Sequence, residues 1–249
     1  MAKHFEDGVE DVQHALAAGR EIRAHGPYGM LIGDEQLNFR PAVIDDPVPT
    51  GRQILSAAGI TDPVEHLVFF VTLAGLLQEV QPDQTVDLRS AGAERFLVFR
   101  NDRSFRLLLN DQTIEWGATR ISGLTLKKLA GVDLGTYVVW LDVRGGQDRL
   151  IGDTELLDLS SPGVERFYTG LRTITVKVNS RPHQVHAEIL TFEEIVQLAF
   201  PGAPTTETRV YTVSFKRGPA SNPQGTVVEN GSVYIKDGML FNVTPTDKS

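Results

Sequence analysis

Short runs in which apolar and polar residues alternate recur along the chain, in pairs separated by an asparagine. Around Asn110, "SFRLLL" leads into "TIEW", and around Asn179, "TITVKV" leads into "PHQVHAEI". Alternation with period two is typical of half-buried β-strands, and asparagine tolerates the left-handed backbone of tight turns. Asn38 holds the equivalent place nearer the amino terminus. The pattern therefore predicts three β-hairpins, with Asn38, Asn110 and Asn179 at their turns.

A short helix is predicted to begin 12 residues after each of these asparagines. Thr50, Ser122 and Thr191 precede the three helical stretches, and each hydroxyl oxygen can accept an unpaired backbone N–H of the first turn. Thr191 and Glu194 also have the spacing of a capping box. The stretches "TGRQILSAAG" and "SGLTLKKLAG" both close on Ala-Gly, and glycine there supplies a left-handed stop.

Further strand-like apolar runs follow each helix. The segment that leads into the last run of the first domain recurs in the second domain. "DLRSAGAERF" (87–96) returns as "DLSSPGVERF" (158–167), and Phe96 and Phe167 are predicted to seat the last strand in the core. Hairpin, helix and further strands form the order of a β-grasp domain, in which the helix crosses between strands and lets the central ones pair in parallel. We predict an α+β fold with three tandem β-grasp domains at 28–102, 103–170 and 171–249. Residues 1–27 are predicted to be a leader that is either disordered or a short helix.

Composition narrows the possible functions. The 249 residues include 41% hydrophobic and 22% charged residues and no cysteine, which excludes disulfides, thiolate metal sites and cysteine nucleophiles. The net charge of −8 argues against broad nucleic-acid binding, because that binding depends on lysine and arginine meeting phosphates. No apolar run approaches the ~18 residues of a membrane span, and the first residues lack the apolar core of a signal peptide. We expect a cytoplasmic protein that binds neither nucleic acid nor membrane.

Candidate catalytic and metal-binding motifs are weak. His183, His186 and Glu188 lie close in sequence, but residues three apart on a strand point to opposite faces, so no metal site is predicted. The chain has no G-x-S-x-G, P-loop or G-x-G-x-x-G motif, and we therefore expect no catalytic residues, no cofactor and no enzymatic activity. "DVRGG" (142–146) looks like the arginine-diglycine end of a protein modifier, but it lies inside the second domain and is predicted to be a turn.

Several longer strings carry a family resemblance. "DDPVPTGRQIL", "VDLRSAGAERF", "DLSSPGVERF", "YTVSFKRG" and "IKDGMLFNVTPTDKS" make residues 28–249 resemble the bacterial multi-ubiquitin family, whose members carry serial ubiquitin-like domains. The resemblance implies a ubiquitin-like protein modifier in a bacterial conjugation pathway, with phage defence as a family-level expectation. The implied partners are proteins similar to activating enzymes, which use ATP, to conjugating enzymes and to deubiquitinating peptidases, together with the target proteins.

In that role the carboxy-terminal segment would be the conjugation tail, comprising Asn242, Val243, Thr244, Pro245, Thr246, Asp247, Lys248 and Ser249. "MLFNV" is predicted to form the last strand, and "TPTDKS" to leave it as an extended tail, because Pro245 removes a donor and the rest is polar. The tail ends in Asp-Lys-Ser where ubiquitin ends in Gly-Gly, so either the enzymes accept a bulkier end or a peptidase trims it. The three domains are expected to stay covalently joined.

Chains built on this protein would need internal attachment sites. The candidate lysines are Lys127, Lys128, Lys177, Lys216 and Lys236, with Lys248 in the tail and Lys3 in the leader as further possibilities. The alternative is an unconjugated adaptor, in which three β-grasp domains display surfaces to partners and the tail is inert.

Overall fold

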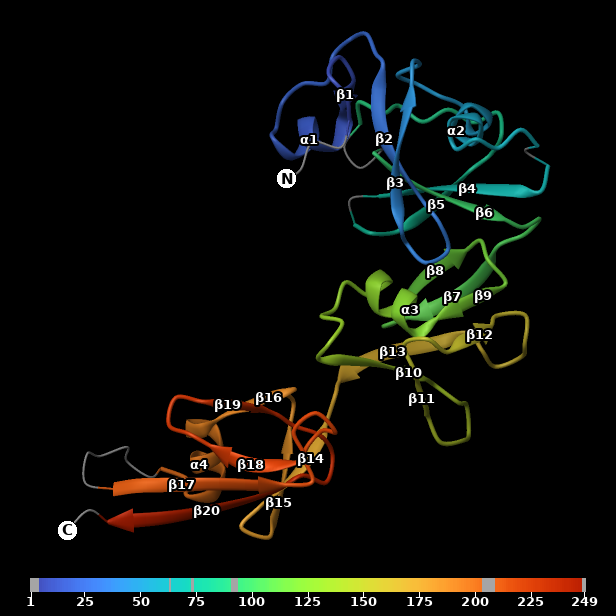
Figure 1. Cartoon of the computed structure of the whole chain (residues 1–249). Helices are drawn as coiled ribbons and strands as arrows, with labels where there is room; N and C mark the ends of the chain where they lie inside the picture. The colour runs from blue at the N-terminus through green and yellow to red at the C-terminus, as the bar shows by residue number, and fades with distance from the viewer. Residues whose placement is uncertain (1–4, 63, 73, 91–93, 203–208, 248–249) are drawn as a thin grey trace. The chain divides into compact units, whose positions relative to one another are not determined.

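The computed structural model describes residues 5–62, 64–72, 74–90, 94–202 and 209–247, and its elements form three main mixed sheets (Figure 1). The first repeat comprises β1 (Glu10–Asp11), α1 (Val12–Ala17), β2 (Tyr28–Gly33), β3 (Phe39–Ile44), α2 (Gly51–Ala57), β4 (His66–Val71), β5 (Leu77–Val80) and β6 (Arg95–Arg100). The second comprises β7 (Phe105–Leu109), β8 (Gln112–Trp116), β9 (Arg120–Ser122), α3 (Gly123–Leu129), β10 (Tyr137–Leu141), β11 (Arg149–Ile151), β12 (Leu156–Asp158) and β13 (Arg166–Leu171). The third comprises β14 (Ile174–Val178), β15 (Arg181–Val185), β16 (Ile189–Thr191), α4 (Phe192–Ala199), β17 (Arg209–Lys216), β18 (Gln224–Val227), β19 (Ser232–Tyr234) and β20 (Leu240–Asp247).

In each repeat the central strands pair in parallel, as predicted, and the last strand lies between the first strand of the hairpin and the strand that follows the helix. In the third repeat the order is β15-β14-β20-β17-β18, with β14 and β20 parallel and β17 and β20 antiparallel. The second repeat has the order β11-β10-β13-β7-β8. The parallel pair requires the helix as its crossover, which is why a helix separates the two hairpins of every repeat. Phe96 and Phe167 are both buried in the last strands, as predicted.

The hairpin turns confirm the sequence prediction at two of the three asparagines. Asn110 and Asn179 have positive φ angles of 51° and 49°, and in each case the next residue is also left-handed. These are two-residue turns between β7 and β8 and between β14 and β15. The first hairpin also forms, with Asn38 in its longer loop, but Leu37 and not Asn38 takes the positive φ, and the Asn38 side chain donates to Asp34.

The three helix starts are capped as predicted. Thr50 and Thr191 each form a complete capping box, with Gln53 and Glu194 as partners. Ser122 accepts a hydrogen bond from the backbone N–H of Thr125. Each cap anchors the start of a short helix, which depends on packing for most of its stability because isolated helices of this length are unstable in water.

The glycine after the first two caps has a packing role. A Cβ added to Gly123 would lie 2.3 Å from the carbonyl oxygen of Gly152, and one added to Gly51 would lie 2.5 Å from that of Gln81. Both glycines admit a loop carbonyl directly against the first helical turn. Phe192 stands at this position in the third repeat, and its N–H donates to the Gly231 carbonyl at 2.9 Å.

Gly123→Ala is therefore expected to destabilise the protein by about 1–3 kcal/mol, because the new methyl group must push a backbone carbonyl away. Urea unfolding of the full chain, followed by circular dichroism, measures the change. Gly152→Ala is the matched control, since its Cβ would first meet Glu155 Cβ at 3.8 Å, an ordinary contact. Equal losses in the two variants would contradict the close-approach argument.

The described part of the leader, from residue 5 onward, contains the short helix that the sequence left as one of two alternatives. Asp11 caps α1 by accepting from the His14 N–H, and Val12 and Ala15 are fully buried, with Val12 in the core of the first repeat. Glu10 is also buried, and its carboxylate lies 2.7 Å from Arg20 and 2.8 Å from Arg23. The ion pairs compensate for removing this charge from water.

The first and second repeats share a hydrophobic core. Phe99 of β6 packs edge-on against Trp116 of β8, with ring centroids 4.8 Å apart, and against Phe69 of β4 at 5.6 Å. A Cβ on Gly117 would lie 2.3 Å from the Phe99 ring, so the ring sits directly on the backbone of the second repeat. The outer face of the first sheet, opposite α2, is therefore an apolar surface buried by the second repeat.

The contacts divide the chain into two compact units. The first comprises Met1–Leu134 and Val138–Gly170, which are the first two repeats, and the second comprises Gly135–Tyr137 and Leu171–Ser249, mainly the third repeat. None of the helices in the described residues has the length and apolar character needed to cross a membrane.

Candidate functional site

The candidate site is β20, which carries most of the segment predicted to be a conjugation tail. β20 pairs with β17 over its entire length, from Lys216 opposite Leu240 to Arg209 opposite Asp247. Its parallel pairing with β14 is much shorter and ends with Val178 opposite Phe241. The second half of β20 therefore has a strand neighbour on one side only.

Asn179 extends the contact on the β14 side by one residue. Its Oδ1 accepts from the Val243 N–H at 2.8 Å, and its Nδ2 donates to the Val243 carbonyl at 3.0 Å. The side chain thus replaces a strand partner for both backbone groups of Val243. Asn110 plays a similar part in the second repeat, where its Oδ1 accepts from the Thr169 N–H at 2.8 Å. Sequence reasoning placed these asparagines at turns but missed this role. Their fixed distance from the helix caps does not signal it, because Asn38 has the same spacing and donates to Asp34 instead.

The prediction of a free tail from Thr244 onward is wrong, because Thr244–Asp247 belong to strand β20. Backbone groups of successive residues in a strand point to opposite sides, so residues two apart point to the same side. Since Val243 points its N–H toward Asn179, Pro245 points its nitrogen to that same side and away from β17. The N–H that proline lacks would face the open edge, where a donor has no partner strand, so Pro245 does not break the pairing with β17. Lys248 and Ser249 lie outside the described residues.

Replacing Asn179 with glycine should loosen β20 at Val243. Glycine keeps the left-handed turn conformation while both side-chain hydrogen bonds are lost, at an expected cost of about 1–2 kcal/mol. Hydrogen exchange at the Val243 amide, measured by NMR, should accelerate about tenfold or more, as expected for that loss of local free energy. Asn110→Gly is the matched control, because it removes the equivalent bonds in the second repeat. Unchanged exchange at Val243 in the Asn179 variant would show that these two hydrogen bonds do not hold β20 in place.

The candidate lysines differ sharply in accessibility. Lys177, Lys216 and Lys236 are exposed, and all lie in the third repeat. Lys128 is half-buried and donates to the Gln36 carbonyl at 2.7 Å, within the contact between the first two repeats. The prediction for Lys127 is corrected: this residue is fully buried, with Nζ 2.6 Å from the Leu134 carbonyl and 2.7 Å from Asp153. An amine held in this way cannot reach an enzyme active site in the folded protein.

The structure also places the "DVRGG" segment and the two histidines that the sequence analysis considered. Arg144, Gly145 and Gly146 form the turn between β10 and β11, with a φ of +71° at Gly145, as predicted. His183 lies on β15, whereas His186 follows the end of that strand and contacts Thr173 and the Arg172 carbonyl. In the part of the chain that the structure describes, no group of three or more metal-ligating side chains gathers at one place.

Comparisons with known proteins agree with the repeated architecture. The family model described as multiubiquitin matches the chain three times in tandem, at residues 34–101, 105–171 and 174–247. The second and third matches span their repeats from the first strand to the last, and the first match begins directly after β2 and ends after β6. A search of the curated proteins finds no match. Because the matched segments cover most of the chain, this protein belongs to the multiubiquitin family.

Proposed function

We propose that this chain is a ubiquitin-like protein modifier that is joined to targets through the segment Asn242–Ser249. The observation that carries the proposal is the asymmetry of the last strands. β6 ends at Arg100 and β7 begins at Phe105, and β13 ends at Leu171 just before Ile174, so both strands lead directly into another domain. β6 and β13 run past their parallel partners by three and four residues, whereas β20 runs past β14 by six residues, as a strand with one open edge.

The proposed chemistry needs three steps at the tail carboxylate. The carboxylate attacks the α-phosphate of ATP on an activating enzyme and displaces pyrophosphate. A cysteine thiolate of the enzyme then displaces AMP to form a thioester, and a target amine or hydroxyl finally displaces the thiol. The thiolate must come from the enzymes, because this chain contains no cysteine. Trimming by a peptidase before the first step is compatible with this scheme.

The pairing of β20 with β17 sets a requirement for this function. If Thr244–Asp247 detach from β17, the six residues from Thr244 to the carboxy terminus reach about 20 Å when extended. That length would allow the carboxylate to enter a buried active site while the domain stays outside. Lys177, Lys216 and Lys236 are the exposed amines of the described third repeat on which a further copy could be built, with Lys128 as a half-buried candidate.

The test is adenylation with and without the tail. Full-length protein, incubated with ATP and an activating enzyme of its own conjugation system, should support ATP–pyrophosphate exchange, and deletion of Thr244–Ser249 should abolish it. Lys236→Arg keeps the tail and an exposed positive charge, so it should behave as the parent does. Exchange that survives the deletion, or no exchange and no adduct with any variant, would refute the modifier function.

An unconjugated adaptor is the second candidate, and the strand pairing through Asp247 favours it. A segment that is hydrogen-bonded as a strand of a sheet is less accessible to an enzyme than a free tail is. In this case the protein would bind partners through its domain surfaces, and binding would be the same with and without Thr244–Ser249. The adenylation experiment separates the two functions.

A further inference from the structure

The outer face of the third sheet differs in chemistry from the corresponding face of the first. Ile32 and Phe96 pair on β2 and β6 as Val178 and Phe241 pair on β14 and β20, and all four are buried. The next residue of each last strand faces outward. By this register, the cross-strand pair Phe69–Leu97 of the first repeat corresponds to the pair Ser214–Asn242 of the third.

The first of these faces is a contact surface in the folded protein. Phe69 and Leu97 are fully buried there, beside the Phe99 ring that packs on Trp116 of the second repeat. The third repeat places polar side chains at the equivalent positions. Its outer face can therefore remain in water, whereas an apolar face there would be exposed only at a cost, and any partner on it would meet polar side chains.

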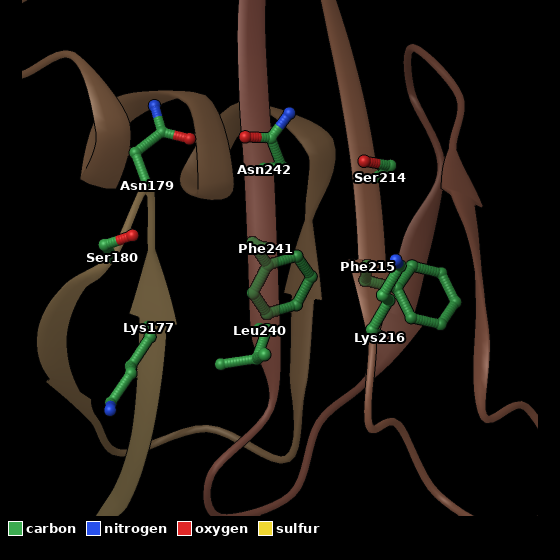
Figure 2. Close-up of a pocket in the computed structure, with 9 residues that line it drawn as sticks. All are labelled: Lys177, Asn179, Ser180, Ser214, Phe215, Lys216, Leu240, Phe241 and Asn242. Atoms are coloured by element: carbon green, nitrogen blue, oxygen red, sulfur yellow. The ribbon is translucent and has the colours of Figure 1, made fainter.

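Figure 2 shows that this third face contains a groove across three adjacent strands. Leu240 of β20 lies between Lys177 of β14 and Lys216 of β17, since both lysines are its direct cross-strand partners. Asn242 and Ser214 form the next row along the sheet, and Ser180 lies at the edge. The groove has a volume of about 370 Å³.

The charges of the groove are available to a partner. Lys177 and Lys216 are both exposed, and within the described residues neither ammonium group forms an ion pair. Neighbouring strands lie roughly 4.8 Å apart, so two strand spacings separate the lysine backbones, and the long stems allow both heads to lean over Leu240. The formal charge of residues 171–249 is +1, from eight basic against seven acidic residues, in a chain of net charge −8.

We propose that this groove binds an extended acidic segment of a partner protein, with an aliphatic side chain over Leu240 and carboxylates on both sides of it. An extended peptide presents alternate side chains to one face, so residues i and i+2 can reach the groove together. Lys177 and Lys216 then pair with the carboxylates, and Asn242 and Ser214 offer hydrogen bonds to the peptide. The inference does not depend on conjugation, since a modifier and an adaptor could both use this surface.

The test uses the full chain and a fluorescein-labelled peptide with a Glu-Leu-Glu centre in a Gly-Ser frame. Fluorescence anisotropy should show salt-dependent binding, weakened at least tenfold by the double variant Lys177→Glu/Lys216→Glu. Lys236→Glu makes the same kind of charge change on an exposed lysine that does not line the groove, and should change the affinity less than twofold. A peptide with Lys-Leu-Lys should not bind the parent, but should bind the double variant.

Three results would overturn the proposal. The first is equal binding of the Glu-Leu-Glu peptide by all variants, and the second is equal binding of acidic and basic peptides by the parent. The third is self-association of the parent in sedimentation velocity that the double variant abolishes, because the occupant would then be a second copy of this chain. Thermal unfolding at an unchanged temperature shows that the double variant keeps its fold.

Discussion

Trp116→Ala is expected to lower the free energy of unfolding of the first unit by about 3–5 kcal/mol, among the larger losses for a single core substitution. The side chain is fully buried, its indole N–H donates to the Arg120 carbonyl at 3.1 Å, and its ring contacts Phe99 of the preceding repeat. Its removal leaves a cavity between two repeats and an unpaired carbonyl. Urea unfolding of the full chain, followed by circular dichroism, measures the loss.

The same substitution tests whether the first two repeats are energetically coupled. Phe99→Ala and the double variant complete a double-mutant cycle, and aromatic pairs in contact are expected to give about 0.5–1.5 kcal/mol of coupling. Leu156→Ala is the control, because that side chain is 62% exposed and its truncation should change stability by less than about 0.5 kcal/mol. Additive effects of Phe99→Ala and Trp116→Ala would contradict a shared core.

Lys127→Ala is expected to lower the free energy of unfolding by about 2–4 kcal/mol. This loss is large for a helical lysine, a residue type that usually lies on the surface. The aliphatic stem is enclosed, and the ammonium group satisfies the Leu134 carbonyl and pairs with Asp153. Because the Asp153 side chain is 45% exposed, its carboxylate regains water when the lysine is removed, so most of the loss comes from the cavity and the Leu134 carbonyl.

Lys127→Met separates these contributions. Methionine fills most of the volume without the charge, and we expect a smaller loss of about 1 kcal/mol, the value of a typical buried hydrogen bond. The Lys177→Ala variant, at an exposed site, should be neutral. Equal stability of Lys127→Ala and the parent in urea would refute the buried position. Under the proposed function, branch peptides mapped by mass spectrometry should also be absent at Lys127.

Much of the architecture could be predicted because its signals are local. The caps at Thr50, Ser122 and Thr191 act within one helical turn, and the two-residue turns at Asn110 and Asn179 need only a left-handed backbone. In the longer loop before β3, the asparagine has a different role, because the Asn38 side chain donates to Asp34. The order of hairpin, helix and strands then left one reasonable sheet topology.

The sequence by itself determined the repeats, the helix starts, the turn in "DVRGG" and the absence of any cysteine chemistry, because each depends on neighbouring residues or on composition. Only the tertiary structure decided that Lys127 is buried while Lys177 and Lys216 are exposed, and that Asn179 holds Val243 across 64 positions of sequence. The strand pairing of Thr244–Asp247 belongs to this second group as well. Periodicity says which residues share a face, but what covers that face depends on chain segments far away, and no local pattern encodes their approach.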